Sequence, residues 1–219
     1  MKVMLCGEGA QDVGQIDLWS IRQERKIQTE GWLQPLLRKL LGNDLEFEIV
    51  PRSRLVSFPS GKLRPPGHGR KAMAAKGRAI SARCDVLVFM IDADTNDADK
   101  WSDKRQQIVD GFAAIPGEVR SVACVPMSTS ESWLLSDAAA WVAIGLQDSS
   151  ALPKRPESLW GEPREPDSDH PHRCFERICG KAGVPDCRAT RAELMSRSTL
   201  DAIKAKCPIS FGTFHEDMA

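Results

Sequence analysis

Three closely spaced carboxylates follow an unbroken apolar run. Residues 86–91 read Val-Leu-Val-Phe-Met-Ile, and Asp92, Asp94 and Asp97 come directly after them. Carboxylates this close together repel one another unless a cation lies between them, and the hard ion Mg²⁺ prefers oxygen ligands. The spacing therefore predicts a divalent-metal site with Asp92 and Asp94 as ligands, and Asp97 as a secondary candidate.

Other acids occupy comparable positions elsewhere in the chain. Glu8 follows the apolar run 3–6 within the sequence Gly-Glu-Gly, Asp12 comes four residues later, and Glu131 follows the run 119–125. A turn acid or a helix-capping acid is the plain interpretation of Glu8 or Glu131 alone. The carboxyl ends of parallel strands share one edge of a sheet, so we expect Glu8, Asp92 and Glu131 to converge there. Convergence favours a single metal site, with Asp12 as a further secondary candidate.

The elements that must position these acids alternate along the chain. Segments rich in apolar residues at 3–6, 45–50, 86–91 and 119–125 predict strands, and residues 31–41, 71–83 and 99–115 have helical character. The run at 86–91 does not alternate with polar residues, which is typical of a strand buried on both faces of a parallel sheet. This order predicts an α/β fold with a mostly parallel four-stranded sheet flanked by helices.

The remaining chain predicts an appendage to this domain. We assign residues 1–146 to the α/β domain and 147–171, rich in Pro, Ser, Asp, Glu and Arg, to an exposed loop. Residues 172–219 form a helical extension packed on the same domain. We expect one helix from Ser128–Ser130 through Val142, with Val142 facing inward, another over 190–205 capped by Thr190, and C-terminal aromatic residues docked on the core.

An acid-free basic stretch precedes the central strand. Residues 51–83 contain nine lysines and arginines and no Asp or Glu, although the whole chain has a formal net charge of zero. A solvated basic face is the plain interpretation, but the position next to a carboxylate cluster favours a polyanion such as nucleic acid. Arg64, His68, Arg70 and Lys71 are the candidate contacts.

Composition limits the classes of protein that this chain can represent. The 42% hydrophobic and 27% charged residues are ordinary for a globular domain, and no apolar stretch approaches a membrane span. The N-terminus reaches an acid too early for a signal peptide, and the seven scattered cysteines suggest reduced thiols, so we expect a cytoplasmic protein without a membrane partner. The chain contains no tyrosine, which excludes a tyrosyl nucleophile.

Several short segments of the chain together resemble a known family. The glycine-flanked Glu8 and the Asp-x-Asp after a hydrophobic strand look like the TOPRIM domain of topoisomerases, primases and nucleases of the overcoming-lysogenisation-defect type. Closer still is a bacterial TOPRIM-like family of unassigned function that is associated with defence genes. The resembling segments are Glu8-Gly9, Asp92-Ala93-Asp94, Glu131-Ser132-Trp133 and Cys207-Pro208-Ile209-Ser210-Phe211, in which Ile209 departs from the family pattern.

The resemblance implies a Rossmann-like TOPRIM fold and a nuclease that uses one or two Mg²⁺ or Mn²⁺ ions. Asp92 and Asp94 would hold the metal, Glu8 would be a general acid/base or second-metal ligand, and Glu131 a further ligand. Without a tyrosine, hydrolysis by water replaces a covalent topoisomerase step. The resemblance also implies a DNA or RNA substrate and a role in anti-phage defence. No ATP-binding Gly-x-x-x-x-Gly-Lys sequence occurs here, so any ATP-driven step would have to come from a separate partner ATPase.

Three alternatives stay open. A haloacid-dehalogenase-like phosphatase would use Asp92 as nucleophile and Asp94 as acid/base, but no acidic pair follows a later strand. A non-catalytic interaction subunit would use the 147–171 loop and the six tryptophans as a partner surface. A zinc site would draw on the late histidines and cysteines, although their spacing matches no standard finger; these residues are His170, His172, Cys174, Cys179 and Cys187.

Overall fold

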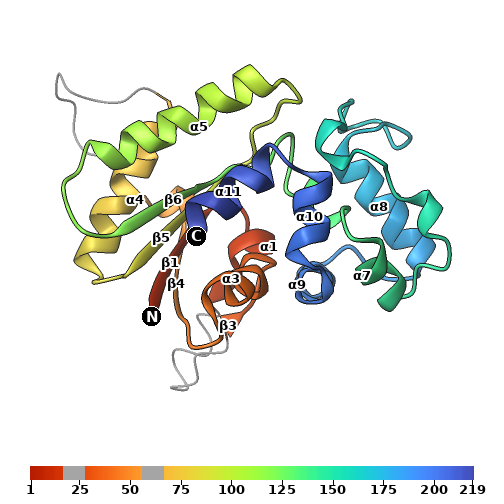
Figure 1. Cartoon of the computed structure of the whole chain (residues 1–219), viewed down its shortest axis with the longest axis horizontal. Coiled ribbons are helices and arrows are strands. Elements are labelled where there is room, and N and C mark those ends of the chain that lie inside the picture. Colours follow the sequence, from red (N-terminus) through yellow and green to blue (C-terminus); the bar gives the residue numbers. More distant parts are fainter. Residues whose placement is uncertain (17–27, 56–66) are drawn as a thin grey trace.

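The protein is a three-layer α/β structure built on one parallel sheet (Figure 1). The computed structural model describes residues 1–16, 28–55 and 67–219. The main strands are β1 (Lys2–Gly7), β4 (Glu46–Pro51), β5 (Val86–Met90) and β6 (Arg120–Cys124). They lie in the order β4-β1-β5-β6, and all neighbouring pairs are parallel. The prediction of an α/β fold with a four-stranded sheet flanked by helices is confirmed.

Helices cover both faces of this sheet (Figure 1). The covering and C-terminal helices are α1 (Ala10–Val13), α3 (Leu33–Leu41), α4 (Gly69–Ser81), α5 (Ala98–Ala113), α6 (Glu131–Leu134), α7 (Ala138–Ala143), α8 (Pro171–Ala182), α9 (Arg188–Arg197), α10 (Leu200–Lys206) and α11 (Ser210–Met218). Short 3₁₀ turns lie at η1 (Arg52–Arg54), η2 (Ser149–Ala151) and η3 (Pro156–Ser158), and a small antiparallel pair joins β2 (Gln15–Ile16) to β3 (Gln28–Thr29).

The side chains of β5 divide between two cores. Val86, Val88 and Met90 contribute to the core on the side of α3 and the C-terminal helices. Leu87 and Phe89 contribute to the core beneath α4 and α5. Because both faces of β5 are covered, apolar residues occupy every position, as the unalternating run predicted.

The C-terminal aromatic residues complete the first of these cores. Phe211 and Phe214 of α11 are buried against Trp133 of α6, with ring centroids 5.1 and 5.5 Å from that of Trp133. The expectation that this segment docks on the core is therefore confirmed. Docking places residues 210–218 beside β6, within the same apolar cluster as the sheet.

Two predicted helices are each broken in two. The prediction of one helix over 190–205 is wrong. Helix α9 ends at Arg197, and α10 begins at Leu200 with Thr199 as the N-cap of α10. The carboxylate of Asp137 accepts hydrogen bonds from the Thr199 backbone N and Oγ1, which fixes the break. Thr190, the expected cap, lies inside α9.

The helix expected from Ser128–Ser130 through Val142 is likewise interrupted. Asp137 also accepts from the backbone N–H groups of Ala139 and Ala140, so a new helix, α7, begins there. The interruption changes the helical phase, and Val142 is 53% exposed rather than inward-facing. No helix within residues 1–16, 28–55 and 67–219 is both long and apolar enough to cross a membrane.

Candidate functional site

The loops that follow β5 and β6 are joined by backbone hydrogen bonds at the carboxyl edge of the sheet. The N–H of Ala93 donates to the carbonyl of Pro126 at 2.9 Å, and the N–H of Asp94 donates to that of Ser128 at 2.9 Å. Asp94 and Ser128 both lie in the left-handed region, with φ of 49° and 58°. Strained backbone of this kind persists where surrounding contacts fix it, and it concentrates at functional sites.

Asp12 and Asp92 form the centre of the site. Asp92 Oδ1 accepts the backbone N–H of Ser130 at 2.8 Å, and Ser130 Oγ donates to Asp12 Oδ1 at 3.2 Å. Asp12 Oδ1 also accepts from Trp32 Nε1 at 2.7 Å. Ser130 therefore brings together carboxylates from the α1 turn and from the end of β5. Among the described residues, the secondary candidate Asp12 is linked to Asp92 through Ser130, whereas Glu8 pairs with Arg52.

The environment of these two carboxylates favours their protonated forms. Burial raises the pKa of Asp92 well above its usual value, and the charges of Asp12, Glu131 and Asp94 raise it further. Burial also raises the pKa of Asp12, although the Trp32 hydrogen bond opposes this shift. Acids that repel one another in a partly closed site are stabilised by a bound cation, and they are common at functional centres.

The free oxygen atoms of this pair are of the chemical kind that Mg²⁺ or Mn²⁺ prefers. Asp92 is partly exposed, and within the described residues neither its Oδ2 nor that of Asp12 accepts a hydrogen bond. Mg²⁺ usually takes one or two protein carboxylates and completes its shell with water and phosphate oxygens. Asp12 and Asp92 therefore supply the number of carboxylates that such an ion usually takes from a protein.

Asp94 lies at the mouth of the site and contacts a lysine that sequence reasoning missed. Its side chain is 74% exposed, and its Oδ2 lies 3.3 Å from Lys104 Nζ. Lys104 also donates to the carbonyl oxygens of Asp92 and Ala93, at 3.2 and 2.8 Å. Helix α5 contains several basic residues, and only the folded structure shows that Lys104 supports the Asp-x-Asp loop.

The secondary candidate Asp97 has a different role. It is the N-cap of α5, where its Oδ1 accepts from the backbone N–H groups of Asp99 and Lys100 at 2.9 and 3.1 Å. An N-cap carboxylate satisfies orphan donors and interacts favourably with the helix dipole. The capping of α5 is therefore sufficient to explain an acid at position 97.

Glu8 follows β1 as expected, but its side chain turns to a different partner. It is about half exposed and forms an ion pair with Arg52 of η1. Among the described residues, no three of the predicted carboxylates place ligand atoms within 4.8 Å of one another. The acids share one edge of the sheet, but they do not close around a single point.

Glu131 is neutralised by protein cations. Its Oε1 lies 2.8 Å from Arg191 Nη2 and 3.0 Å from His172 Nδ1, and its side chain is buried. Burial alone would raise the pKa of Glu131, but the His172 hydrogen bond and the Arg191 charge hold it well below its usual range. In this arrangement Glu131 has its positive partners already.

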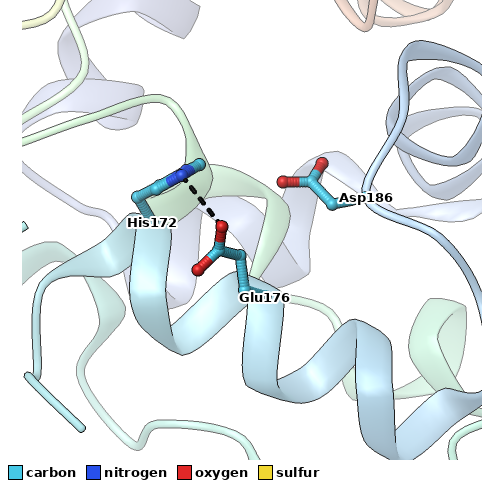
Figure 2. Close-up of side chains that lie close together, drawn as sticks. All are labelled: His172, Glu176 and Asp186. Atoms are coloured by element: carbon cyan, nitrogen blue, oxygen red, sulfur yellow. Dashed lines mark ion pairs between the residues drawn. The ribbon is translucent and has the colours of Figure 1, made fainter. Parts of the chain in front are cut away.

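A group with metal-ligand geometry lies beside Glu131. His172 and Glu176 of α8 and Asp186 from the following segment place ligand atoms within 4.8 Å of one another (Figure 2). Arg191 already occupies both oxygens of Asp186, at 2.8 and 3.0 Å. The hydrogen bond to Glu131 raises the pKa of His172, which favours the protonated ring over a neutral metal ligand. The group is therefore best explained as an ion-pair network.

The zinc alternative gains no support from the late cysteines. All seven cysteines are free, and none belongs to the metal-capable group found among the described residues. Cys174 and Cys179 are buried on α8, and Cys187 contacts Thr190 Oγ1 at 3.3 Å. His170 caps α8 by accepting the backbone N–H of His172.

The predicted nucleic-acid contacts lie in several environments. Arg70 is exposed in the first turn of α4, and His68 lines a hollow that also contains Asp94. Lys71 donates to the Leu55 carbonyl at 2.7 Å, which gives it a structural role. Arg64 lies outside the described residues.

Comparison of the chain with protein-family models, with curated proteins and with solved structures finds no match.

Proposed function

We propose that this protein is a Mg²⁺- or Mn²⁺-dependent nuclease that hydrolyses phosphodiester bonds. The observation that carries the proposal is the Ser130-linked pair Asp12 and Asp92 at the carboxyl edge of a parallel sheet. Both carboxyl groups have raised pKa values, and both keep one oxygen without a hydrogen bond from the described residues. Ligands of open α/β sheets gather at this edge.

Each residue of the site has a separate proposed role. Asp12 and Asp92 would hold the ion, which when bound neutralises charge on the scissile phosphate and lowers the pKa of an attacking water. Lys104 fixes the loop that carries Asp92 and keeps its ammonium group beside Asp94. Asp94, exposed at the mouth, is a candidate for contact with water in the metal shell. Glu8 as a general acid/base stays a prediction, and that role requires it to leave Arg52.

The direct test is cleavage by the purified full-length chain. Single-stranded and duplex DNA and RNA are incubated with Mg²⁺, Mn²⁺ or chelator, and products are resolved on gels. We expect metal-dependent cleavage that Asp92→Asn and Asp12→Asn reduce at least a hundredfold. Glu46→Gln is the matched control, because Glu46 is an exposed acid at the opposite edge of the same sheet. Undiminished cleavage by Asp92→Asn would refute the assignment.

The same preparation separates the alternatives. A phosphatase that uses Asp92 as nucleophile would hydrolyse a phosphate monoester such as p-nitrophenyl phosphate and leave the corresponding diester intact. An interaction subunit would show neither activity and no thermal stabilisation by millimolar Mg²⁺ or Mn²⁺. Participation in anti-phage defence rests on the family resemblance, and any ATP-driven step would require a separate ATPase.

A further inference from the structure

One tryptophan differs from the others that the structure describes. Four of them are buried, and each indole N–H donates to an internal acceptor: Trp32 to Asp12, Trp101 to the Val125 carbonyl, Trp133 to Ser210 and Trp141 to the Leu134 carbonyl. Trp160 is 47% exposed, and its indole N–H has no partner within the described chain. Burial and hydrogen bonding therefore explain the other four, but neither explains Trp160.

Trp160 lies between two hollows that meet at Asp94. One hollow, of about 560 Å³, is lined by Trp160, Asp94, His68, Lys100 and Lys104, among others. The second, of about 480 Å³, is lined by Trp160, Asp94, Gly161, Glu162, Pro163 and His170. Both volumes fall in the range that small-molecule sites occupy.

The loop that carries Trp160 is held in place by helix α8. Arg173 Nε donates to the Pro163 carbonyl at 2.6 Å, and Arg177 Nη1 donates to the carbonyls of Pro166 and Ser168 at 2.8 and 2.7 Å. Gly161 lies so close to Ser168 that an added Cβ would meet the Ser168 Oγ at 2.2 Å. The loop is thus anchored to α8 on the C-terminal side of Trp160, which reduces the entropy lost when a ligand binds.

We infer that Trp160 is a stacking platform for an unpaired base of a single-stranded nucleic acid whose phosphate lies at the Asp94 end of the site. An exposed indole face stacks on any base, whereas bases inside a duplex are already stacked. The inference deepens the proposed nuclease function and rests on it for the placement of the phosphate.

The charged residues that line the first hollow indicate that nucleic-acid binding there requires a cation. The hollow contains the carboxylates of Asp94, Asp97 and Asp103 and the ammonium groups of Lys100 and Lys104. This balance alone would repel a phosphate, so tight binding of an oligonucleotide requires the divalent ion that we propose at Asp12 and Asp92. Binding should therefore depend on both Trp160 and the ion.

The test measures binding of a labelled oligothymidylate by fluorescence anisotropy. The full-length chain is used with Ca²⁺, which takes the same oxygen ligands as Mg²⁺ but in a larger and less regular shell; gels check that the probe stays intact. We expect Trp160→Ala to weaken binding roughly ten- to a hundredfold, as loss of one stacked base does elsewhere. Trp160→Phe should retain most of the affinity, and chelator should abolish it. Val142→Ala, which removes another exposed apolar side chain on α7, should have no effect.

The outcomes separate this inference from the nuclease proposal. Equal affinity of Trp160→Ala and wild type, or no binding of the oligonucleotide at all, would overturn the inference. A Trp160-dependent complex without cleavage in Mg²⁺ or Mn²⁺ would overturn the nuclease proposal alone. Equal weakening for a blunt duplex of matched length would overturn the preference for an unpaired base.

Discussion

Ionisation of the Asp92 carboxyl group should measurably lower the free energy of unfolding of the metal-free chain. Because its pKa is raised on folding, Asp92 binds its proton more tightly when folded than when unfolded. Its contribution therefore favours the folded state at low pH and is lost as the pH rises from the unfolded pKa, about 4, through the folded value. At neutral pH the ionised group opposes folding unless a cation is bound.

Asp92→Asn should consequently raise the melting temperature at neutral pH in the absence of metal. Asparagine keeps an oxygen that can accept the Ser130 N–H, but it removes repulsion from Asp12. For a chain of this size, each kcal/mol gained raises the melting temperature by roughly 2–4 °C. Millimolar Mg²⁺ should stabilise the wild type and not the variant. Calorimetry of the variant with Glu46→Gln as control checks this; a lower melting temperature with an unchanged Mg²⁺ response would contradict it.

Residue types and spacing were sufficient to nominate Asp92 and Asp94 as candidates, because the signal lies within one short segment. The place of Asp12 depends on Ser130, 118 positions away, and on Trp32, 20 positions away. The pairing of Glu131 depends on Arg191, 60 positions away. No local pattern encodes such contacts, so a sequence can nominate acids but cannot say which of them a protein cation has already neutralised.

At the scale of elements, Arg191 joins three helices. It lies on α9 with a side chain only 4% exposed, and it contacts Glu131 of α6, Asp186 and the ring of Phe175 on α8. A buried charge is costly when its partner is removed, because the remaining charge cannot return to water. The packing of α6, α8 and α9 should therefore depend on this one guanidinium group.

Arg191→Met should destabilise the protein by about 3–5 kcal/mol in urea denaturation. Arg197→Met on the same helix is the matched control, because the exposed Arg197–Glu193 pair should be worth about 0.5 kcal/mol or less. The double variant Arg191→Met/Glu131→Gln should be less destabilised than the sum of its single variants, since no unpaired Glu131 charge is left. Equal losses of stability in Arg191→Met and Arg197→Met would show that the buried network contributes no more to stability than the exposed ion pair.

Most elements were predictable because their apolar periodicity agrees with the final packing. The four strands of the main sheet and the helices α3, α4 and α5 lie within a few residues of their expected bounds. The failures at 131–142 and 190–205 have a common cause. Asp137 caps α7 and binds Thr199, 62 positions away, so one tertiary contact interrupts two patterns that look continuous in the sequence.

At the scale of the whole molecule, the α/β sheet and the C-terminal helices share one apolar core. Val88 and Val122 of the sheet belong to the same buried cluster as Phe175 of α8 and Phe214 of α11. Figure 1 shows α11 returning from the C-terminal helices to lie against the sheet. The division at residue 146 therefore separates segments of sequence whose side chains are buried together.

A chain limited to residues 1–146 should fail to form a cooperative domain, because it would expose the face of Trp133 that Phe211 and Phe214 cover. We expect it to lack a near-ultraviolet circular dichroism transition on heating, and to regain one when residues 147–219 are co-expressed as a separate chain. Phe214→Ala in the full chain should lower the free energy of unfolding by about 3–5 kcal/mol, because it removes a ring that covers Trp133. The matched control is Ile209→Ala, because Ile209 is 41% exposed at the start of the same helix and should cost far less. Cooperative unfolding of residues 1–146 alone, with a Mg²⁺-dependent shift, would instead establish this segment as an independent domain that carries the site by itself.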